Sequence, residues 1–131
     1  MAQKIGSYKI WRFKAESIKE SFIMEKMKSV EQFHSIVKSG VTIAVFSADW
    51  CPDCVVIKPI LPEIENEYSA IQFVYVDRDE LIELCQELDI FGIPSFVAFK
   101  DGEEIGRYVN KERKTKEQIT AFLDELNITS K

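Results

Sequence analysis

The sequence has little cysteine, glycine or proline: its 131 residues include three Cys, five Gly and four Pro. Three cysteines are too few, and odd in number, for a disulfide-stabilised fold, and the low glycine and proline contents exclude collagen-like and low-complexity chains. No apolar run approaches the ~18 residues of a membrane-spanning helix, and no apolar stretch of signal-peptide length follows the basic N-terminus. The sequence therefore predicts a soluble, cytoplasmic protein that does not interact with membranes.

Basic side chains are concentrated at the N-terminus. Residues 1–23 carry five basic and two acidic side chains, a net charge of +3, whereas the rest of the chain carries 12 basic and 20 acidic ones, a net charge of −8. The acidic part contains one basic cluster, Lys111, Arg113, Lys114 and Lys116, which we interpret as a solvated loop before a helix. Because a phosphate-binding surface needs more clustered lysine and arginine, we predict that the protein does not bind nucleic acid.

The length predicts one domain, which we place over residues 24–131. We regard residues 1–23 as a basic N-terminal extension. Its apolar residues are spaced three or four apart, as in an amphipathic helix: Tyr8, Trp11, Ala15, Ile18 and Phe22. We favour two simpler explanations, a leader added by cloning or translation from an upstream start with Met24 as the natural beginning.

Four runs of β-branched and apolar residues predict strands, over residues 41–46, 72–77, 95–100 and 104–109. The last two flank Asp101-Gly102 and predict a hairpin, because this dipeptide accepts the positive φ angles of a tight turn. Ser29-Val-Glu-Gln32 and Thr115-Lys-Glu-Gln118 fit capping boxes, so a helix should follow each of them. Between these, one helix is expected to begin at Cys51 and another after Asp79, which can cap it. Pro59 and Pro62 should bend or divide the second helix.

This order of elements predicts an α/β fold. We expect a central mixed sheet of about four strands, with helices on both faces and an antiparallel hairpin near the C-terminus.

Two cysteines, Cys51 and Cys54, lie where a predicted strand ends and a helix begins. Residues three apart on a first helical turn lie on the same face and are close enough to form a short disulfide. The free N–H groups and the helix dipole favour the thiolate form of Cys51, whereas Cys54 is expected to be more buried. We therefore predict that Cys51 attacks a substrate disulfide and that Cys54 then attacks the mixed disulfide to release reduced substrate.

The Trp-Cys-Pro-Asp-Cys sequence at residues 50–54 resembles the Trp-Cys-x-x-Cys motif of the thioredoxin superfamily. Pro59, five residues after the second cysteine, and Pro94, before the predicted hairpin, match two further features of that family. The resemblance covers about residues 24–126. It implies a thioredoxin-like fold with a cis peptide bond before Pro94.

The resemblance also implies which residues meet the substrate. The backbone around Ile93 would pair with an extended substrate segment beside Pro94, and the exposed surface would include Trp50 and Pro52. Two other candidates are interpreted as structural: Cys85 as an inert thiol buried on an amphipathic helix, and His34 as a solvated side chain.

Typical thioredoxins bury an aspartate six residues before the first cysteine and place a lysine on the adjacent strand, a pair thought to move the proton of the second cysteine. The matching positions here are Val45 and Phe73, so this pair is absent. Our hypothesis is that Asp53, next to Cys54, accepts the proton. The alternative is that Asp53 stabilises the first turn of the helix.

The function implied is that of a thiol–disulfide oxidoreductase acting chiefly as a disulfide reductase in cell redox homeostasis. No bound cofactor or metal is expected, and electrons would come from NADPH through a flavoprotein thioredoxin reductase. The partners would be disulfide-containing proteins or small disulfides, and the protein would be a monomer. The alternative is a thioredoxin-fold module that binds a protein partner without turnover.

Overall fold

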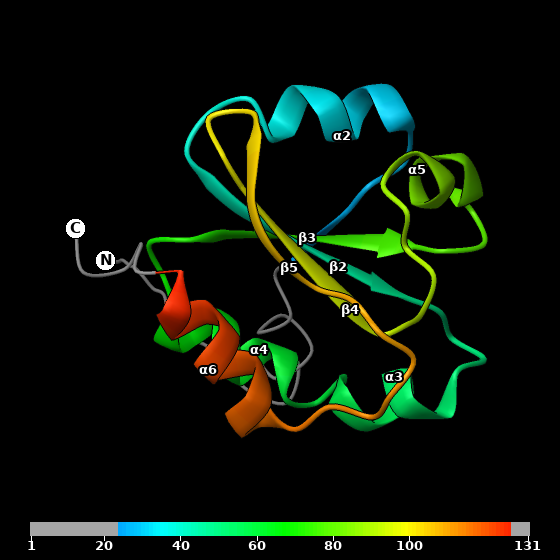
Figure 1. The fold of residues 1–131 in the computed structure, drawn as a ribbon, viewed down its shortest axis with the longest axis vertical. Coiled ribbons are helices and arrows are strands. Elements are labelled where there is room, and N and C mark those ends of the chain that lie inside the picture. The colour runs from blue at the N-terminus through cyan, green and yellow to red at the C-terminus, as the bar shows by residue number, and fades with distance from the viewer. Residues whose placement is uncertain (1–23, 127–131) are drawn as a thin grey trace, which may run out of the picture.

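The computed structural model describes residues 24–126, which form a five-stranded sheet between two groups of helices (Figure 1). The strands are β1 (Glu25–Lys26), β2 (Val41–Ser47), β3 (Gln72–Asp77), β4 (Ser95–Lys100) and β5 (Glu103–Tyr108). Their order in the sheet is β1-β3-β2-β4-β5. β2 runs parallel to β3 and antiparallel to β4, and β4 pairs antiparallel with β5. The predicted mixed sheet and its antiparallel hairpin are confirmed.

The strand that the sequence did not indicate is β1. It has two residues, both charged and exposed, and it pairs with β3 through Glu25↔Val74 and Lys26↔Tyr75. A strand of this length has no alternation of apolar and polar residues from which it could be recognised. The sheet therefore has one more strand than expected, at its edge.

Helices cover both faces of the sheet, as predicted (Figure 1). α2 (Val30–Ile36) and α5 (Ile82–Glu87) lie on one face, and α3 (Pro52–Ile57), α4 (Leu61–Glu67) and α6 (Lys116–Glu125) lie on the other. The predicted division of the second helix is confirmed, since Pro59 lies in the break between α3 and α4 and Pro62 lies in the first turn of α4. Within residues 24–126, no helix combines the length and the apolar character needed to cross a membrane.

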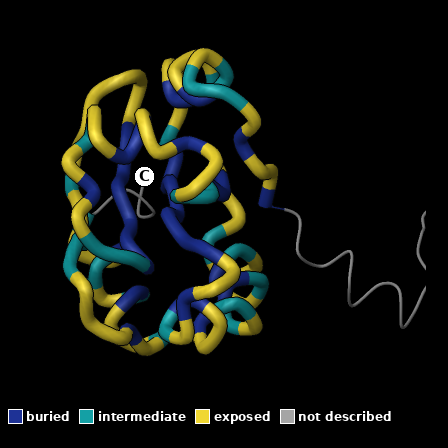
Figure 2. Tube along the Cα trace, turned by 90° about the vertical axis from the view of Figure 1, so that its right-hand side faces the viewer, coloured by how far each residue is buried: buried dark blue, intermediate teal, exposed yellow. Residues whose placement is uncertain are grey.

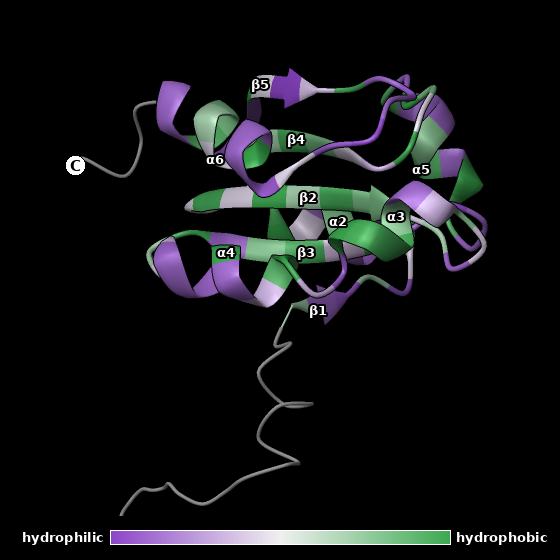
Figure 3. Cartoon of the chain, turned by 90° about the horizontal axis from the view of Figure 1, so that it is seen from below, coloured by the Kyte–Doolittle hydropathy of each residue, from purple (hydrophilic) through white to green (hydrophobic). Residues whose placement is uncertain are grey.

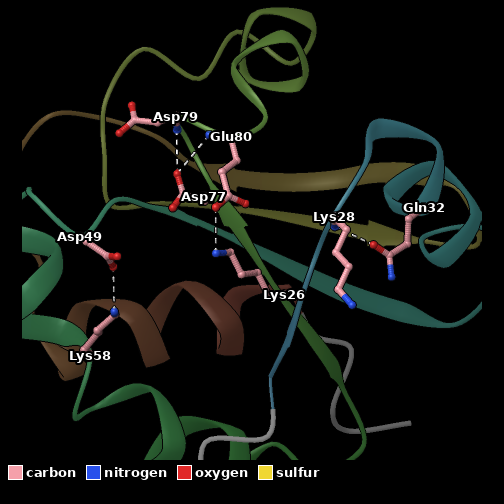
Figure 4. A network of polar contacts seen from close by, with 8 residues as sticks. All are labelled: Lys26, Lys28, Gln32, Asp49, Lys58, Asp77, Asp79 and Glu80. Atoms are coloured by element: carbon pink, nitrogen blue, oxygen red, sulfur yellow. Dashed lines mark hydrogen bonds and ion pairs between the residues drawn. The ribbon is translucent and has the colours of Figure 1, made fainter.

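The two predicted capping boxes differ. Thr115 at the start of α6 forms a complete box, because its hydroxyl accepts from the Gln118 N–H and the Gln118 side chain accepts from the Thr115 N–H. At α2, Ser29 Oγ accepts from the Gln32 N–H at 3.0 Å, but Gln32 Oε1 accepts from the Lys28 N–H instead of that of Ser29 (Figure 4). The box at α2 is therefore half formed.

The prediction that Asp79 caps α5 is wrong. The helix begins after Leu81, which makes no side-chain cap. Asp77 accepts from the N–H groups of Asp79 and Glu80 at 2.8 and 3.2 Å and so orders the turn that precedes the helix (Figure 4). The Asp79 carboxylate is thereby left to make a contact elsewhere.

The core consists of two apolar layers, one on each face of the sheet. Figure 2 shows buried strands inside a shell of exposed turns, and Figure 3 shows the apolar character of β2 and β3. Along β2, Ile43 and Val45 belong to the layer under α3, α4 and α6, whereas Ala44 and Phe46 belong to the layer under α2 and α5. This alternation confirms that β2 is buried on both faces.

The hairpin turns at Asp101 and Gly102, which have φ angles of 52° and 92°. These are the positive values that the dipeptide was expected to adopt.

Candidate active site at the end of the central strand

The two cysteines lie at the carboxyl end of β2. Cys51 is the N-cap residue of α3, and its sulfur accepts a hydrogen bond from the Cys54 N–H at 3.3 Å. Both cysteines are free thiols, with exposed fractions of 6% for Cys51 and 0% for Cys54. The helix start therefore directs an N–H donor at the sulfur of Cys51, an arrangement that stabilises a thiolate there. The predicted order of burial is also correct, although Cys51 is itself largely covered.

Burial sets the ionisation of Cys54. It raises the pKa of the Cys54 thiol to about 11, and the hydrogen bond with Cys51 adds to the rise. Contacts with the Ser47 hydroxyl and the Ala48 backbone lower the pKa but do not cancel the effect of burial. Cys54 therefore keeps its proton at neutral pH and must lose it before it can act as a nucleophile.

A loop before β4 covers the cysteines. The Ile93–Pro94 peptide bond is cis, as the resemblance implied. Ile93 packs against both cysteines, and its carbonyl oxygen lies 3.9 Å from Cys51 Sγ. Ser95 Oγ donates to the Gly92 carbonyl at 2.6 Å and so closes the loop. Pro94 is buried, whereas Ile93 is partly exposed.

An exposed indole stands beside this buried pair. Trp50 is 60% exposed, and its Nε1–H donates to Asp79 Oδ2 at 2.6 Å. The Arg78 guanidinium lies 5.8 Å from the centre of the indole ring. Pro52, which follows Cys51 in the chain, is also exposed. The turn before α5 therefore holds Trp50 in place, a role of Asp79 that sequence reasoning missed because the two residues are far apart in the chain.

The two carboxylates nearest the cysteines in the sequence both have cationic partners. Asp53 Oδ1 accepts from Arg113 Nε at 2.8 Å, which links α3 to the segment before α6. Asp49 Oδ1 lies 3.1 Å from Lys58 Nζ (Figure 4).

The pairing of β2 with β3 shows that Phe73 is not the residue to compare with the buried lysine of typical thioredoxins. Tyr75, rather than Phe73, lies beside Val45, because Phe73 pairs with Ile43. Burial raises the pKa of Tyr75, and the ammonium of Lys58 lies 5.8 Å from the centre of its ring. The acid and the lysine of the typical pair are absent from these two positions.

The interpretation of Lys114 as part of a solvated loop is wrong. Its side chain is 1% exposed, and its ammonium donates to three oxygens of the segment before α6. Of the basic cluster, Lys111 and Arg113 are exposed, as expected. A lysine within a run of charged residues carries no sequence signal of burial.

The structure agrees with the interpretation of Cys85 as a buried thiol and of His34 as a solvated side chain. Cys85 is buried in the layer under α2 and α5, where burial raises the pKa of its thiol to about 11. His34 Nε2 lies 3.0 Å from Glu87 Oε2 at the surface. The part of the chain that the structure describes contains no group of three or more His, Cys, Asp or Glu side chains that could hold a metal ion.

Comparisons with known proteins agree with this geometry. The family model described as Thioredoxin matches residues 24–125. A mitochondrial thioredoxin-2 from Schizosaccharomyces pombe is 30% identical over 113 residues, which cover 83% of this chain and 85% of the relative. A thioredoxin from Chlamydia caviae is 32% identical over 91 residues, which cover 70% and 89%.

Solved structures support the same assignment. The crystal structure of thioredoxin from Trypanosoma brucei brucei superposes with a TM-score of 0.73 at 25% identity, covering 79% of this chain and 90% of that one. The Schistosoma mansoni thioredoxin gives a TM-score of 0.69 at 27% identity, covering 78% and 94%. The chain, with its adjacent cysteines at the start of α3, belongs to the thioredoxin family and is a thiol–disulfide oxidoreductase that acts as a protein-disulfide reductase.

Proposed function

We propose that the protein reduces disulfides through a cycle in which Cys51 attacks the substrate and Cys54 resolves the mixed disulfide. The observation that carries this assignment is the hydrogen bond from the Cys54 N–H to the Cys51 sulfur at the N-terminus of α3. It stabilises the sulfur that meets the substrate, while Cys54 remains buried and protonated until it is needed.

The cycle transfers two electrons. The Cys51 thiolate attacks one sulfur of the substrate disulfide, a Cys51–substrate bond forms, and the other substrate sulfur leaves as a thiolate that takes a proton from water. Cys54 then loses its proton and attacks Cys51 Sγ. The Cys51–Cys54 disulfide forms as the Cys51–substrate bond breaks, and the second substrate sulfur leaves.

The substrate would bind across the exposed surface beside Cys51. Trp50 and Pro52 contribute side chains, and the partly exposed Ile93 offers backbone groups at the edge of the loop that contains Pro94. The fixed position of Trp50, held by Asp79, supports this assignment because a preorganised aromatic side chain loses little entropy on binding.

We retain Asp53 as the proposed proton acceptor for Cys54, since it neighbours Cys54 in the sequence. Its bond to Arg113 fits the alternative role equally well, because it anchors the first turn of α3 to the segment before α6. The two roles predict different kinetics for Asp53→Asn.

The proposed reductant is NADPH acting through a flavoprotein thioredoxin reductase, with no cofactor bound to this chain. We further propose a monomer in the cytoplasm, where free cysteines are kept reduced. Turnover with NADPH and a purified reductase, sedimentation velocity and cell fractionation test these three proposals. Recovery in the mitochondrial fraction, which the name of the fission-yeast relative suggests, would overturn the location.

The first test is turnover of insulin and of cystine, with dithiothreitol as electron source and Cys51→Ser as control. We expect both substrates to be reduced and both activities to be lost in Cys51→Ser. Reduction of cystine alone would indicate a restricted binding surface. No reduction above the control would contradict the proposed cycle.

No observation favours the alternative of a binding module without turnover, because both cysteines are present and the Cys54 N–H contacts the Cys51 sulfur. A module of that kind would keep its partner in Cys51→Ser, whereas a reductase loses its activity.

A further inference from the structure

The Lys114 ammonium is a buried charge in the segment that Arg113 joins to the first turn of α3. It donates to Asn110 Oδ1 at 2.8 Å, to the Glu112 carbonyl at 2.9 Å and to the Asn110 carbonyl at 3.4 Å. A protonated lysine has three N–H donors, so the three oxygens match the charged form. The Tyr108 ring, whose centre lies 5.1 Å from Nζ, adds a favourable aromatic contact.

The charge of Lys114 has no counter-ion in direct contact. All three acceptors are uncharged oxygens, and no carboxylate within residues 24–126 forms an ion pair with Lys114. A buried charge without such a partner is unfavourable unless an anion lies close enough to compensate it. Burial lowers the pKa of Lys114, whereas negative charge on Cys54, Asp53, Glu112 and Cys51 raises it, with Cys54 the strongest of the four.

The position of this charge relative to the cysteines is fixed by two contacts of the segment that surrounds it. Arg113 binds Asp53 in the first turn of α3. The Asn110 backbone lies so close to Gly92 that a Cβ at Gly92 would be 2.4 Å from the Asn110 carbonyl oxygen. The segment before α6 is therefore joined both to the cysteine helix and to the loop that contains Pro94.

We propose that Lys114 is a positioning residue of the active site, whose buried ammonium stabilises the Cys54 thiolate while Cys54 resolves the mixed disulfide. The inference rests on the proposed cycle. Lys114 does not itself take up a proton: the Cys54 proton leaves to its acceptor, and the ammonium stabilises the anion that remains. Three other charged groups act on this part of the site. The negative charges of Asp53 and Glu112 disfavour a thiolate at Cys54, and the positive charge of Arg113 is paired with Asp53.

The test measures the resolving step directly, with dithionitrobenzoate as the probe. Cys51 attacks the probe and releases one thionitrobenzoate, and Cys54 then attacks Cys51 and releases the second. In a stopped-flow experiment, the pH dependence of the second phase reports how readily Cys54 ionises. Cys85 does not interfere, because it is buried on the other side of the sheet.

We expect Lys114→Met to slow the second phase about tenfold at pH 7 and to move its pH midpoint upward by about one unit, with an unchanged rate at high pH. Lys116→Met is the matched control, because Lys116 is paired with Glu63 and Glu67 on α4. It should leave the second phase unchanged.

Asn110→Asp tests the charge without removing an atom from the site. It keeps the acceptor for Lys114 but turns it into a carboxylate, so it should shift the midpoint in the same direction as Lys114→Met. Asn66→Asp makes the same change on the exposed surface of α4 and should have no effect. Lys114→Arg keeps the positive charge, so the pH midpoint of its second phase should stay close to that of the parent protein.

Three outcomes are decisive. If Lys114→Met and Asn110→Asp both give the parent profile, the electrostatic role is wrong. A shift in Lys114→Met without one in Asn110→Asp would show that lost packing is responsible, and it too overturns the inference. If the parent protein never releases the second thionitrobenzoate, the proposed cycle itself fails.

Discussion

The two sulfurs of the site lie three residues apart but differ in their surroundings. Cys51 receives an N–H donor at a helix start, whereas Cys54 is enclosed and holds its proton up to a pKa of about 11. Because Cys54 keeps its proton while its N–H group binds the Cys51 sulfur, Cys51 is the cysteine placed to attack first. The order of attack therefore follows from their positions on one helical turn.

The place of both cysteines at the junction of β2 and α3 could be predicted, because their spacing and the buried strand before them are local features. The sequence did not predict Lys114, because the burial of a lysine depends on oxygens that the folded segment brings around it. The bond between Trp50 and Asp79 could not be predicted either, since it depends on how the turn after β3 approaches the end of β2.

The two roles proposed for Asp53, proton acceptor and anchor of the first turn of α3, predict different effects of the Asp53→Asn substitution. If Asp53 accepts the Cys54 proton, Asp53→Asn should slow the second phase of thionitrobenzoate release about tenfold or more, since general bases contribute ~10²–10⁴-fold in enzymes. Stability should change by less than about 1 kcal/mol, because the ion pair with Arg113 is partly exposed to solvent.

Asp49→Asn is the control for this experiment, because it removes another paired carboxylate near the motif. Unchanged kinetics in Asp53→Asn would leave Asp53 with a structural role only.

Among the elements, the helices differ in how well their starts are capped. α6 has a complete capping box, α2 has half of one, and α5 begins without any side-chain cap. The sequence pattern indicated the first two correctly in position, because a Ser or Thr followed three residues later by Gln is a local signal. It failed at α5 because Asp77 and Asp79 both precede the helix, and the turn geometry decides which of them binds the backbone.

We expect Thr115→Ala to lower the free energy of unfolding by about 1 kcal/mol, because it removes the side-chain acceptor of the α6 capping box. Thr120→Ala, within the same helix, should change the stability by less than about 0.5 kcal/mol, since alanine has the higher helix propensity. Urea denaturation measures both. Equal losses in the two variants would show that the box contributes nothing specific.

Gly92 joins two elements of the site. In Gly92→Ala the new methyl group would meet the Asn110 backbone, which cannot move without shifting the segment that holds Lys114. We expect a loss of about 1–3 kcal/mol in stability together with slower insulin reduction.

Gly106→Ala provides the comparison, because its methyl group would clash with the end of the Leu126 side chain and not with backbone, and would be in ordinary contact with the Phe122 ring. It should leave insulin reduction unchanged. Full activity in Gly92→Ala would contradict the proposed link between the two loops.

For the whole molecule, the buried thiols make stability depend on pH. Burial raises the pKa of Cys54 and of Cys85 from 9.0 to about 11 in the folded state. Between these values the unfolded chain has released protons that the folded chain retains, so the free energy of unfolding falls as pH rises from 9 to 11. We expect a loss on the order of 1–2 kcal/mol per thiol in the reduced protein.

The oxidised protein is the control, because the Cys51–Cys54 disulfide has no thiol left to ionise. Its stability should fall less steeply over the same pH range, with only Cys85 contributing among the cysteines. Parallel curves for the two forms, measured by denaturant titration at each pH, would contradict the burial of Cys54 as the cause.

The arrangement of the sheet was predictable for a physical reason. β2 and β3 are continuous apolar runs that only a sheet covered on both faces can bury, and the Asp101-Gly102 turn makes β4 and β5 a hairpin. The edge strand β1 was not predictable, because its two charged residues join the sheet through backbone pairing alone.

The pairing of Phe46 with Ser95 joins segments that are far apart in the chain, and this separation has a consequence for synthesis on the ribosome. At about 5–20 residues per second, the stretch from Cys54 to Ser95 takes roughly 2–8 s to translate. During nearly all of that interval the nascent chain contains the cysteine pair but not Ile93, which packs against the pair in the folded protein. The cysteine pair therefore gains this cover only after synthesis has passed residue 93.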